Sequence, residues 1–250
     1  MAHLTTKGLV LREVNYKESD KILTVLVEGQ GKRTVKAQGC RRKNSPLAAA
    51  SQLLVYSDMT LYDYQDRWSM KEANTLEEFR GLQKDLSRLA LGTYFAEVCE
   101  AVSEEGLETP GLLPLVLNSL YALDKLGKPE ELVKAAFEIK LCCLIGYEPM
   151  VDACALCGTE PEEPRFHLAE GVLHCRRCRE ALAGEGISLP LDRGSLAALR
   201  YTAYGDPKRL FSFQLPAESL DILAGVAEGF LLTQLERGFR SLDFYKGLAG

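Results

Sequence analysis

Long hydrophobic runs are missing from this sequence. No apolar stretch among its 250 residues approaches the roughly 18 residues needed to cross a lipid bilayer. The opening residues, 1–7, hold no apolar segment of the secretory type, so we expect no secretory signal. At 46% hydrophobic and 26% charged residues, the composition also excludes a disordered chain and a coiled-coil rod. The sequence therefore predicts a cytoplasmic globular protein with no membrane partner.

Recognisable catalytic motifs are missing as well. The three histidines, His3, His167 and His174, are too few and too scattered to indicate a nucleophile–base pair. The chain has no hydrolase elbow, no zinc-protease helix motif and no complete phosphate-binding loop. We therefore expect that the protein is not an enzyme.

The charge is unevenly distributed along the chain. The net charge is −5, yet residues 1–43 carry ten Lys or Arg against four Asp or Glu, a local net of +6. The other 207 residues must then carry −11. Such asymmetry is typical of a protein with a polyanionic partner, although a merely solvated basic face would give the same count.

Residues 1–75 have the pattern of β-strands. Gly29 and Gly31 suit a tight connection between two of them, and Ser45 before Pro46 predicts a short helix over residues 45–50. Three strands, a short helix and two strands is the order of an OB-fold, a partly open five-stranded barrel, although other small barrels share the strand count. The candidate strands are residues 8–14, 22–27, 32–37, 53–64 and 67–74.

The fourth candidate strand has two distinct faces. Its aliphatic face, expected in the barrel core, holds Leu53, Val55, Met59 and Leu61. Its other face holds Tyr56, Thr60, Tyr62 and Tyr64. This tyrosine face is either a stacking platform for bases or a surface covered by the next domain. We favour the covered surface, because a helical region follows at once in the chain.

The rest of the chain is predicted to be helical. Apolar residues recur at helical spacing over residues 77–103, 112–126, 131–146, 193–201 and 217–238. The predicted fold class is α+β, with an N-terminal OB-fold barrel and a C-terminal α-helical domain. We place the barrel at residues 1–78 and the helical domain at 79–250, interrupted by a cysteine-bearing insertion at about 150–185.

Two Cys-x-x-Cys pairs form the most specific motif in the chain. Cys154 and Cys157 are separated from Cys175 and Cys178 by seventeen residues, a spacing typical of a four-thiolate zinc site. Gly158 would let the first pair fold back, and residues 165–174 between the pairs suggest a small hairpin. The site has no evident open position, so we predict one structural zinc per chain. A redox pair, or a ligand role for His167 or His174, is the weaker alternative.

A basic loop follows the third candidate strand. Arg41, Arg42 and Lys43 lie where the mouth of the barrel is expected, and Lys32, Arg33 and Lys36 lead into them. Basic grooves on OB-folds follow the phosphate backbone of nucleic acid, with an attraction that falls steeply with salt. A loop kept polar for solubility is the alternative.

Several stretches of the chain match motifs of a known family. Those near the N-terminus are Gly8-Leu-Val-Leu-Arg12, the run at residues 15–24, Glu28-Gly-Gln-Gly-Lys32 and the run at residues 36–42, and the chain ends with Arg240-Ser-Leu-Asp-Phe244. These stretches resemble the bacterial RecO family of DNA repair proteins. The resemblance covers essentially the whole chain, from the barrel through the helices and the zinc insertion.

The resemblance implies a recombination mediator located in the cytoplasm at the nucleoid. RecO proteins bind single- and double-stranded DNA and anneal complementary strands. With RecR, and often RecF, they help to load RecA onto single strands coated by single-strand-binding protein (SSB). Carried over to this chain, the family's DNA contacts on the barrel fall on Arg33, Lys36, Arg41, Arg42 and Lys43, beside Lys32. Some RecO proteins lack the zinc cysteines, which implies that zinc stabilises the helical domain rather than serving a function common to the family.

Two other classes of protein stay open at this point. A zinc-ribbon adaptor for transcription or translation, binding only protein through its barrel, would fit the same composition. An enzyme with a reactive Cys40 is more distant, since neighbouring Arg41 and Arg42 could lower the pKa of its thiol.

Overall fold

The computed structural model describes residues 2–65, 67–180 and 186–248, which form two compact units. Unit 1 comprises Met1–Lys125 and Phe239–Gly250, and unit 2 comprises Leu126–Gly238. Unit 1 therefore joins the strand-rich N-terminal region and the helices that follow it with a C-terminal helix. The domain boundary expected at residue 78 lies where the sequence pattern changes from strand to helix. The compact units are divided by a different criterion, so that boundary stays a prediction.

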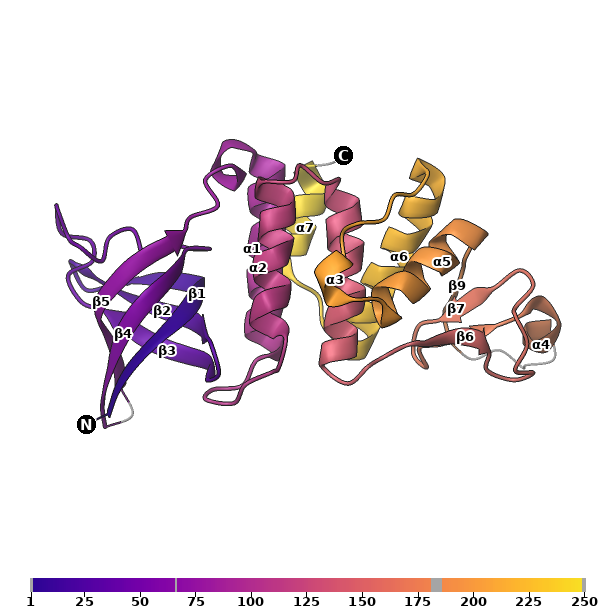
Figure 1. Cartoon of the computed structure of the whole chain (residues 1–250), viewed down its shortest axis with the longest axis horizontal. Coiled ribbons are helices and arrows are strands. Elements are labelled where there is room, and N and C mark those ends of the chain that lie inside the picture. The colour runs from indigo at the N-terminus through magenta and orange to yellow at the C-terminus, as the bar shows by residue number, and fades with distance from the viewer. Residues whose placement is uncertain (1, 66, 181–185, 249–250) are drawn as a thin grey trace. The chain divides into compact units, whose positions relative to one another are not determined.

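The N-terminal strands close into a five-stranded barrel (Figure 1). The strand order is β1-β2-β3-β5-β4, and β1 closes the barrel by pairing antiparallel with both β2 and β4. The β3–β5 pair is parallel and short, running from Val35↔Trp68 to Ala37↔Met70. This arrangement confirms the predicted OB-like barrel. The strands are β1 (Ala2–Tyr16), β2 (Asp20–Val27), β3 (Gly31–Ala37), β4 (Tyr56–Tyr64) and β5 (Arg67–Glu77).

The barrel core is built from the inward positions of the alternating strands. Val10, Leu23, Val25, Met59 and Leu61 are all at most 1% exposed. Successive side chains of a strand point to opposite faces, so one aliphatic set per strand fills the interior. The aliphatic face predicted for the fourth strand is confirmed at Met59 and Leu61, which both point into this core.

The connection between β3 and β4 differs from its prediction. The expected helix over residues 45–50 is a series of turns, and the fourth strand begins at Tyr56 instead of residue 53. The cap is formed, because the Leu47 amide donates to Ser45 Oγ at 3.3 Å. Leu47 and Ala50, however, are drawn into the barrel core, which favours a turning path over a regular helix. Leu54, at φ 61°, then holds the chain out of extended conformation just before the strand.

The tyrosine face of β4 is only partly covered. Tyr56 lines a cavity of about 350 Å³ together with Leu113 and Leu117 of α2 (Leu112–Asp124). Tyr64, at the far end of the strand, is 56% exposed. The expected cover is therefore correct at Tyr56 and wrong at Tyr64, because α2 packs near only one end of β4.

The first helix of unit 1 starts later than the hydrophobic pattern predicts, whereas the second starts at Leu112 as predicted. The chain from 77 to 85 holds only a 3-10 turn, η1 (Leu82–Lys84), and α1 (Leu86–Val102) begins where the Asp85 carboxylate accepts the amides of residues 87 and 88. Leu86, one of the apolar residues in the predicted helical range 77–103, is 58% exposed and lies in this first turn. A C-terminal helix, α7 (Arg240–Leu248), packs on α1 and was not predicted as a helix.

Unit 2 combines three long helices with a small sheet. The predicted hairpin is confirmed, since β7 (Arg165–His167) and β8 (Val172–His174) pair antiparallel within the sheet order β6-β8-β7-β9. No helix in the described part of the chain is long and apolar enough to cross a membrane. The remaining elements are α3 (Glu130–Leu144), β6 (Met150–Cys154), α4 (Arg176–Glu180), β9 (Ser188–Pro190), α5 (Arg193–Tyr204), η2 (Pro207–Arg209) and α6 (Ala217–Leu235).

Candidate metal centre and nucleic-acid interface

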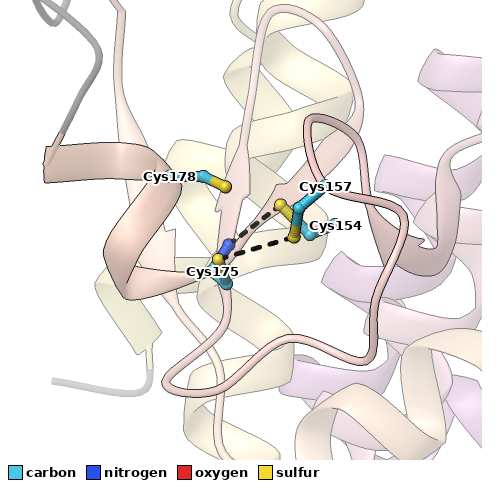
Figure 2. A group of neighbouring side chains, drawn as sticks. All are labelled: Cys154, Cys157, Cys175 and Cys178. Atoms are coloured by element: carbon cyan, nitrogen blue, oxygen red, sulfur yellow. Dashed lines mark hydrogen bonds between the residues drawn. The ribbon is translucent and has the colours of Figure 1, made fainter.

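Four cysteine sulfurs converge at one edge of the small sheet in unit 2. The Sγ atoms of Cys154, Cys157, Cys175 and Cys178 all lie within 4.8 Å of one another (Figure 2). The Cys157 and Cys175 sulfurs are 3.9 Å apart, far from the S–S bond length of a disulfide. Tetrahedral zinc with Zn–S bonds of about 2.3 Å has sulfurs about 3.8 Å apart, so the spacing fits a metal ion.

Two local turns bring these sulfurs together. Cys154 ends β6, and the chain folds back at once because the Gly158 amide donates to Cys154 O and the Cys154 amide donates to Thr159 O, each at 2.9 Å. Gly158 has φ +69°, the left-handed conformation that glycine adopts without strain. Cys175 follows β8 directly, and Cys178 lies one turn later on α4.

Hydrogen bonds to two of the four sulfurs lower their thiol pKa values and so favour the thiolate form. The pKa of Cys157 is lowered to about 6, chiefly because the Thr159 hydroxyl and amide hydrogen-bond to its sulfur. Burial raises the pKa of Cys154, but the amides of Cys175 and its other neighbours outweigh it and lower the value. The pKa of Cys178 is raised to about 12 by hydrogen bonding to the Cys175 sulfur and by burial.

The pKa values of Cys157 and Cys154 are lowered while that of Cys178 is raised, so without a cation the four sulfurs cannot all be thiolates at neutral pH. Four thiolates so close together repel one another, so some must keep their protons unless a cation is bound. A divalent cation would remove that repulsion. The four cysteines could therefore hold a metal ion. His167 and His174 lie outside the group and face each other, with ring centroids 5.9 Å apart, so the weaker histidine alternative is not supported.

The arginines around the metal centre are already engaged in part. Arg176 pairs with Glu163 at 3.0 Å and with Glu180 at 3.1 Å. Its charge is therefore paired with Glu163 and with Glu180, at the end of α4, rather than with the sulfurs.

A second cluster of like charges lies at one end of the barrel. The β1–β2 turn and the loop after β3 meet there, because the Arg41 amide donates to Ser19 O at 3.0 Å. The Arg41 guanidinium also reaches Lys17 O, at 3.4 Å. We call this cluster the basic surface; its cations are Lys17, Lys36, Arg41, Arg42 and Lys43, and all but the half-buried Lys36 are exposed.

A buried carboxylate fixes the basic surface to the barrel. Asp20, only 6% exposed, accepts the Gly39 amide at 2.8 Å and pairs with Lys36 Nζ at 3.0 Å. The Gly39 amide, and next the Lys36 ammonium, hold the pKa of Asp20 below its usual value. Asp20 is therefore ionised at neutral pH and positions both Lys36 and the loop.

The other two predicted cations on β3 are held by protein partners. Lys32 Nζ donates to Glu100 O, near the C-terminal end of α1, at 2.8 Å. Arg33 donates to Gln30 Oε1 at 3.0 Å and lies 5.1 Å from the centroid of the Trp68 ring. The structure therefore separates the six predicted DNA-binding residues into four on the basic surface and two that pack within unit 1. Their assignment to DNA stays a prediction.

Sequence reasoning missed Lys17 and the adjacent Tyr16. Tyr16 is 42% exposed, with Lys17 Nζ at 5.4 Å and Lys36 Nζ at 5.7 Å from its ring centroid. In an antiparallel meander the first turn and the end of the third strand lie at the same end of the sheet. That rule could have placed Lys17 beside the loop containing Arg41.

Cys40, which the sequence left open as a reactive thiol, is buried. It is 3% exposed and packs into the barrel core, although its neighbours Arg41 and Arg42 face solvent. A buried thiol is poorly placed for nucleophilic chemistry.

Comparison with known proteins gives a consistent assignment over the whole chain. The model for the recombination protein O N-terminal region matches residues 1–79, and that for the C-terminal region matches residues 83–243. The protein is similar to the DNA repair protein RecO of Acetivibrio thermocellus, at 33% identity over 99% of this chain and 98% of that protein. It is also similar to the DNA repair protein RecO of Symbiobacterium thermophilum, at 30% identity over 98% and 97% of the two chains. With the barrel, the helices and the cysteine cluster in the expected order, this chain belongs to the RecO family.

Proposed function

We propose that this protein is a recombination mediator that binds single- and double-stranded DNA on the basic surface. The observation that carries the proposal is the meeting of Lys17, Lys36, Arg41, Arg42 and Lys43 at one end of an OB-like barrel. OB-folds commonly bind polymers over the face of strands 2 and 3 and the adjoining loops. The basic surface lies on that face, and family membership supports DNA as the polymer.

The proposed activity is annealing of complementary strands. Two single strands repel each other through their phosphates, and cations that neutralise phosphates reduce that repulsion. Base pairing then supplies the sequence specificity, and annealing makes or breaks no covalent bond. The proposal accordingly assigns no catalytic residue and treats the protein as a non-enzyme.

We further propose that the four cysteines bind one structural zinc ion. The tetrahedral spacing of their sulfurs and the absence of an oxygen ligand among the described residues of the group favour zinc. When bound, zinc would neutralise thiolate charge and link the end of β6 to β8 and α4.

The partner proteins of this proposal follow from membership of the RecO family. We propose that the chain acts with RecR, and with RecF, to help RecA load onto single strands coated by SSB. The cytoplasmic nucleoid is the corresponding location, because all of these partners act on DNA.

The test is annealing of two complementary oligonucleotides by the purified protein, followed across a salt titration, on bare and on SSB-coated strands. We expect acceleration on both substrates, weakening as salt rises. The double variant Arg41→Glu/Arg42→Glu should lose most of it. The matched control is Lys208→Glu/Arg209→Glu, which makes the same charge change on the exposed η2 turn of unit 2 and should anneal like the wild type.

Three results would contradict the proposal. Acceleration of neither substrate would favour the protein-binding adaptor. Acceleration of bare strands alone would leave DNA binding in place but remove the mediator role. Equal losses in the two double variants would show that net charge, rather than the basic surface, drives annealing.

A further inference from the structure

We propose that Tyr16 is a stacking platform for an unpaired nucleobase, so that the basic surface binds single strands more tightly than duplexes. The inference deepens the proposed function and rests on it. It names a ligand group, the face of an exposed base, that the basic loop alone would not recognise.

The position of Tyr16 suits a stacking contact. It is the last residue of β1, and the residue is 42% exposed beside the turn that carries Lys17. Val14, two positions earlier on the same face of β1, is 48% exposed, so an apolar strip leads up to the ring. In the antiparallel register Val14 lies opposite Ile22, and Ile22 lies opposite Lys36. A base on the ring would therefore lie over the β1–β2–β3 face of the barrel.

The cations around Tyr16 suit the backbone of the same strand. Lys17 and Lys36 place their ammonium groups over the Tyr16 ring, 5.4 and 5.7 Å from its centroid, so a base has to stack on the part of the ring that they leave exposed. Arg41 is tied to the turn through Lys17 O. Asp20 fixes Lys36 at 3.0 Å, so this cation does not have to be ordered by the ligand. Proteins that bind single strands combine such a basic track with aromatic side chains on which bases stack.

The same geometry explains a preference for unpaired DNA. In a duplex the base faces are covered by their neighbours, and a protein reaches only the phosphates, the sugars and the base edges in the grooves. In a single strand a base can turn onto the ring while its phosphates meet the lysines and arginines. Tyr16 should therefore contribute to single-strand affinity and not to duplex affinity.

The chain provides a matched control for this role. Tyr64 is another exposed tyrosine on the barrel, 56% exposed, and β1–β4 pairing places it beyond Ala2, at the opposite end of β1 from Tyr16. Removing its ring makes the same chemical change away from the basic surface.

The experiment measures the affinity of the full-length protein for three fluorescein-labelled probes at one fixed salt concentration. The probes are an unstructured single-stranded oligonucleotide, the same oligonucleotide with abasic sites, and a duplex of equal length. We expect Tyr16→Ala to weaken binding of the first probe about tenfold and to leave the other two within twofold. Tyr16→Phe, which keeps the aromatic face, and Tyr64→Ala should both bind like the wild type.

A second readout tests stacking directly. A 2-aminopurine base in the single strand should lose fluorescence on binding to the wild type and to Tyr16→Phe, and keep it on binding to Tyr16→Ala. An unchanged affinity of Tyr16→Ala for the single strand would overturn the inference. So would an equal loss on the duplex, because that would assign the effect to the shape or charge of the surface. If the wild type binds none of the probes, the proposed function itself is overturned.

Discussion

The basic surface of the barrel and the cysteine cluster of unit 2 solve the same electrostatic problem in opposite ways. Each gathers like charges that would repel one another. The lysines and arginines of the basic surface lie largely in solvent, where water and salt screen them until a polyanion arrives. The cysteine sulfurs converge on one another, two of them buried, where only a bound cation can offset four thiolates. The comparison suggests that exposure decides whether the counter-charge is a transient partner or a permanent part of the fold.

The cations of β3 are an intermediate case. Lys32 and Arg33 belong to the same basic stretch of sequence as Arg41, yet their side chains already have acceptors or an aromatic ring within unit 1. Their charges are therefore used within unit 1, where Lys32 holds α1 against the barrel and Arg33 packs on Trp68 of the neighbouring strand β5.

The largest expected effect comes from removing the zinc ion that we propose for the cysteine cluster. Structural zinc contributes about 10–16 kcal/mol in small finger peptides, so we expect chelation or Cys175→Ser to lower the stability of the small sheet by at least about 5 kcal/mol. Metal analysis should find one zinc per reduced chain. Hydrogen exchange should then become fast over residues 150–180 after chelation, while the barrel core stays protected.

Cys143→Ser is the control for this prediction, because Cys143 is a half-buried cysteine outside the cluster. It should keep both the metal and the slow exchange. Slow exchange over residues 150–180 in metal-free protein would contradict a structural role for the ion. A large change in DNA affinity on chelation would break the comparison, since it would make the two charge clusters depend on each other.

The next largest effect separates Lys32 from Lys43. Lys32→Met keeps most of the aliphatic stem but removes the hydrogen bond to Glu100 O, so we expect a loss of about 1–2 kcal/mol in the free energy of unfolding. DNA affinity should change less than twofold. Lys43→Met is the matched variant in the exposed loop and should do the reverse, weakening DNA binding several-fold at unchanged stability.

Urea unfolding and DNA titration of both variants check this separation. If Lys32→Met weakens DNA binding as much as Lys43→Met does, β3 contributes directly to the DNA contact. The division of the six predicted cations into two groups would then be wrong.

The smallest effect is a pH dependence that originates at Asp20. Because its pKa is lowered in the folded protein, the unfolded chain binds the proton first as pH falls, near the usual value of about 3.9. The stabilisation is present above that pH and is lost as pH falls toward the folded pKa. Thermal unfolding from pH 7 to pH 3 should therefore show wild type and Asp20→Asn converging in acid. Asp221→Asn, at an exposed carboxylate on α6, should run parallel to the wild type over the same range. If the stability of Asp20→Asn runs parallel to that of the wild type from pH 7 to pH 3, the ionised Asp20 carboxylate does not anchor the loop.

Features encoded by neighbouring residues could be predicted from the sequence. Period-two alternation located the strands, and the two Cys-x-x-Cys spacings with Gly158 located the sulfur cluster, because each pattern is set within a few residues. The start of α1 was misplaced, since the apolar pattern of residues 77–86 outweighed the N-cap signal of Asp85.

Features that depend on distant contacts could not be predicted. Lys32 and Lys43 look alike in the sequence, and only the carbonyl of Glu100, 68 positions away from Lys32, distinguishes their roles. Cys40 likewise looks exposed beside two arginines until the barrel closes over it. Long-range packing, rather than residue type, decides which charges remain free for a partner.

The salt dependence of single-strand affinity tests the account most directly. Each phosphate contact on single-stranded DNA adds about 0.7 to the slope of log affinity against log salt concentration. The account predicts that Arg41→Glu/Arg42→Glu binds more weakly than the wild type, with a slope shallower by about 1.4 or more. The control Lys208→Glu/Arg209→Glu should keep the wild-type slope. Equal slopes for the wild type and Arg41→Glu/Arg42→Glu would contradict the assignment of DNA phosphates to the basic surface.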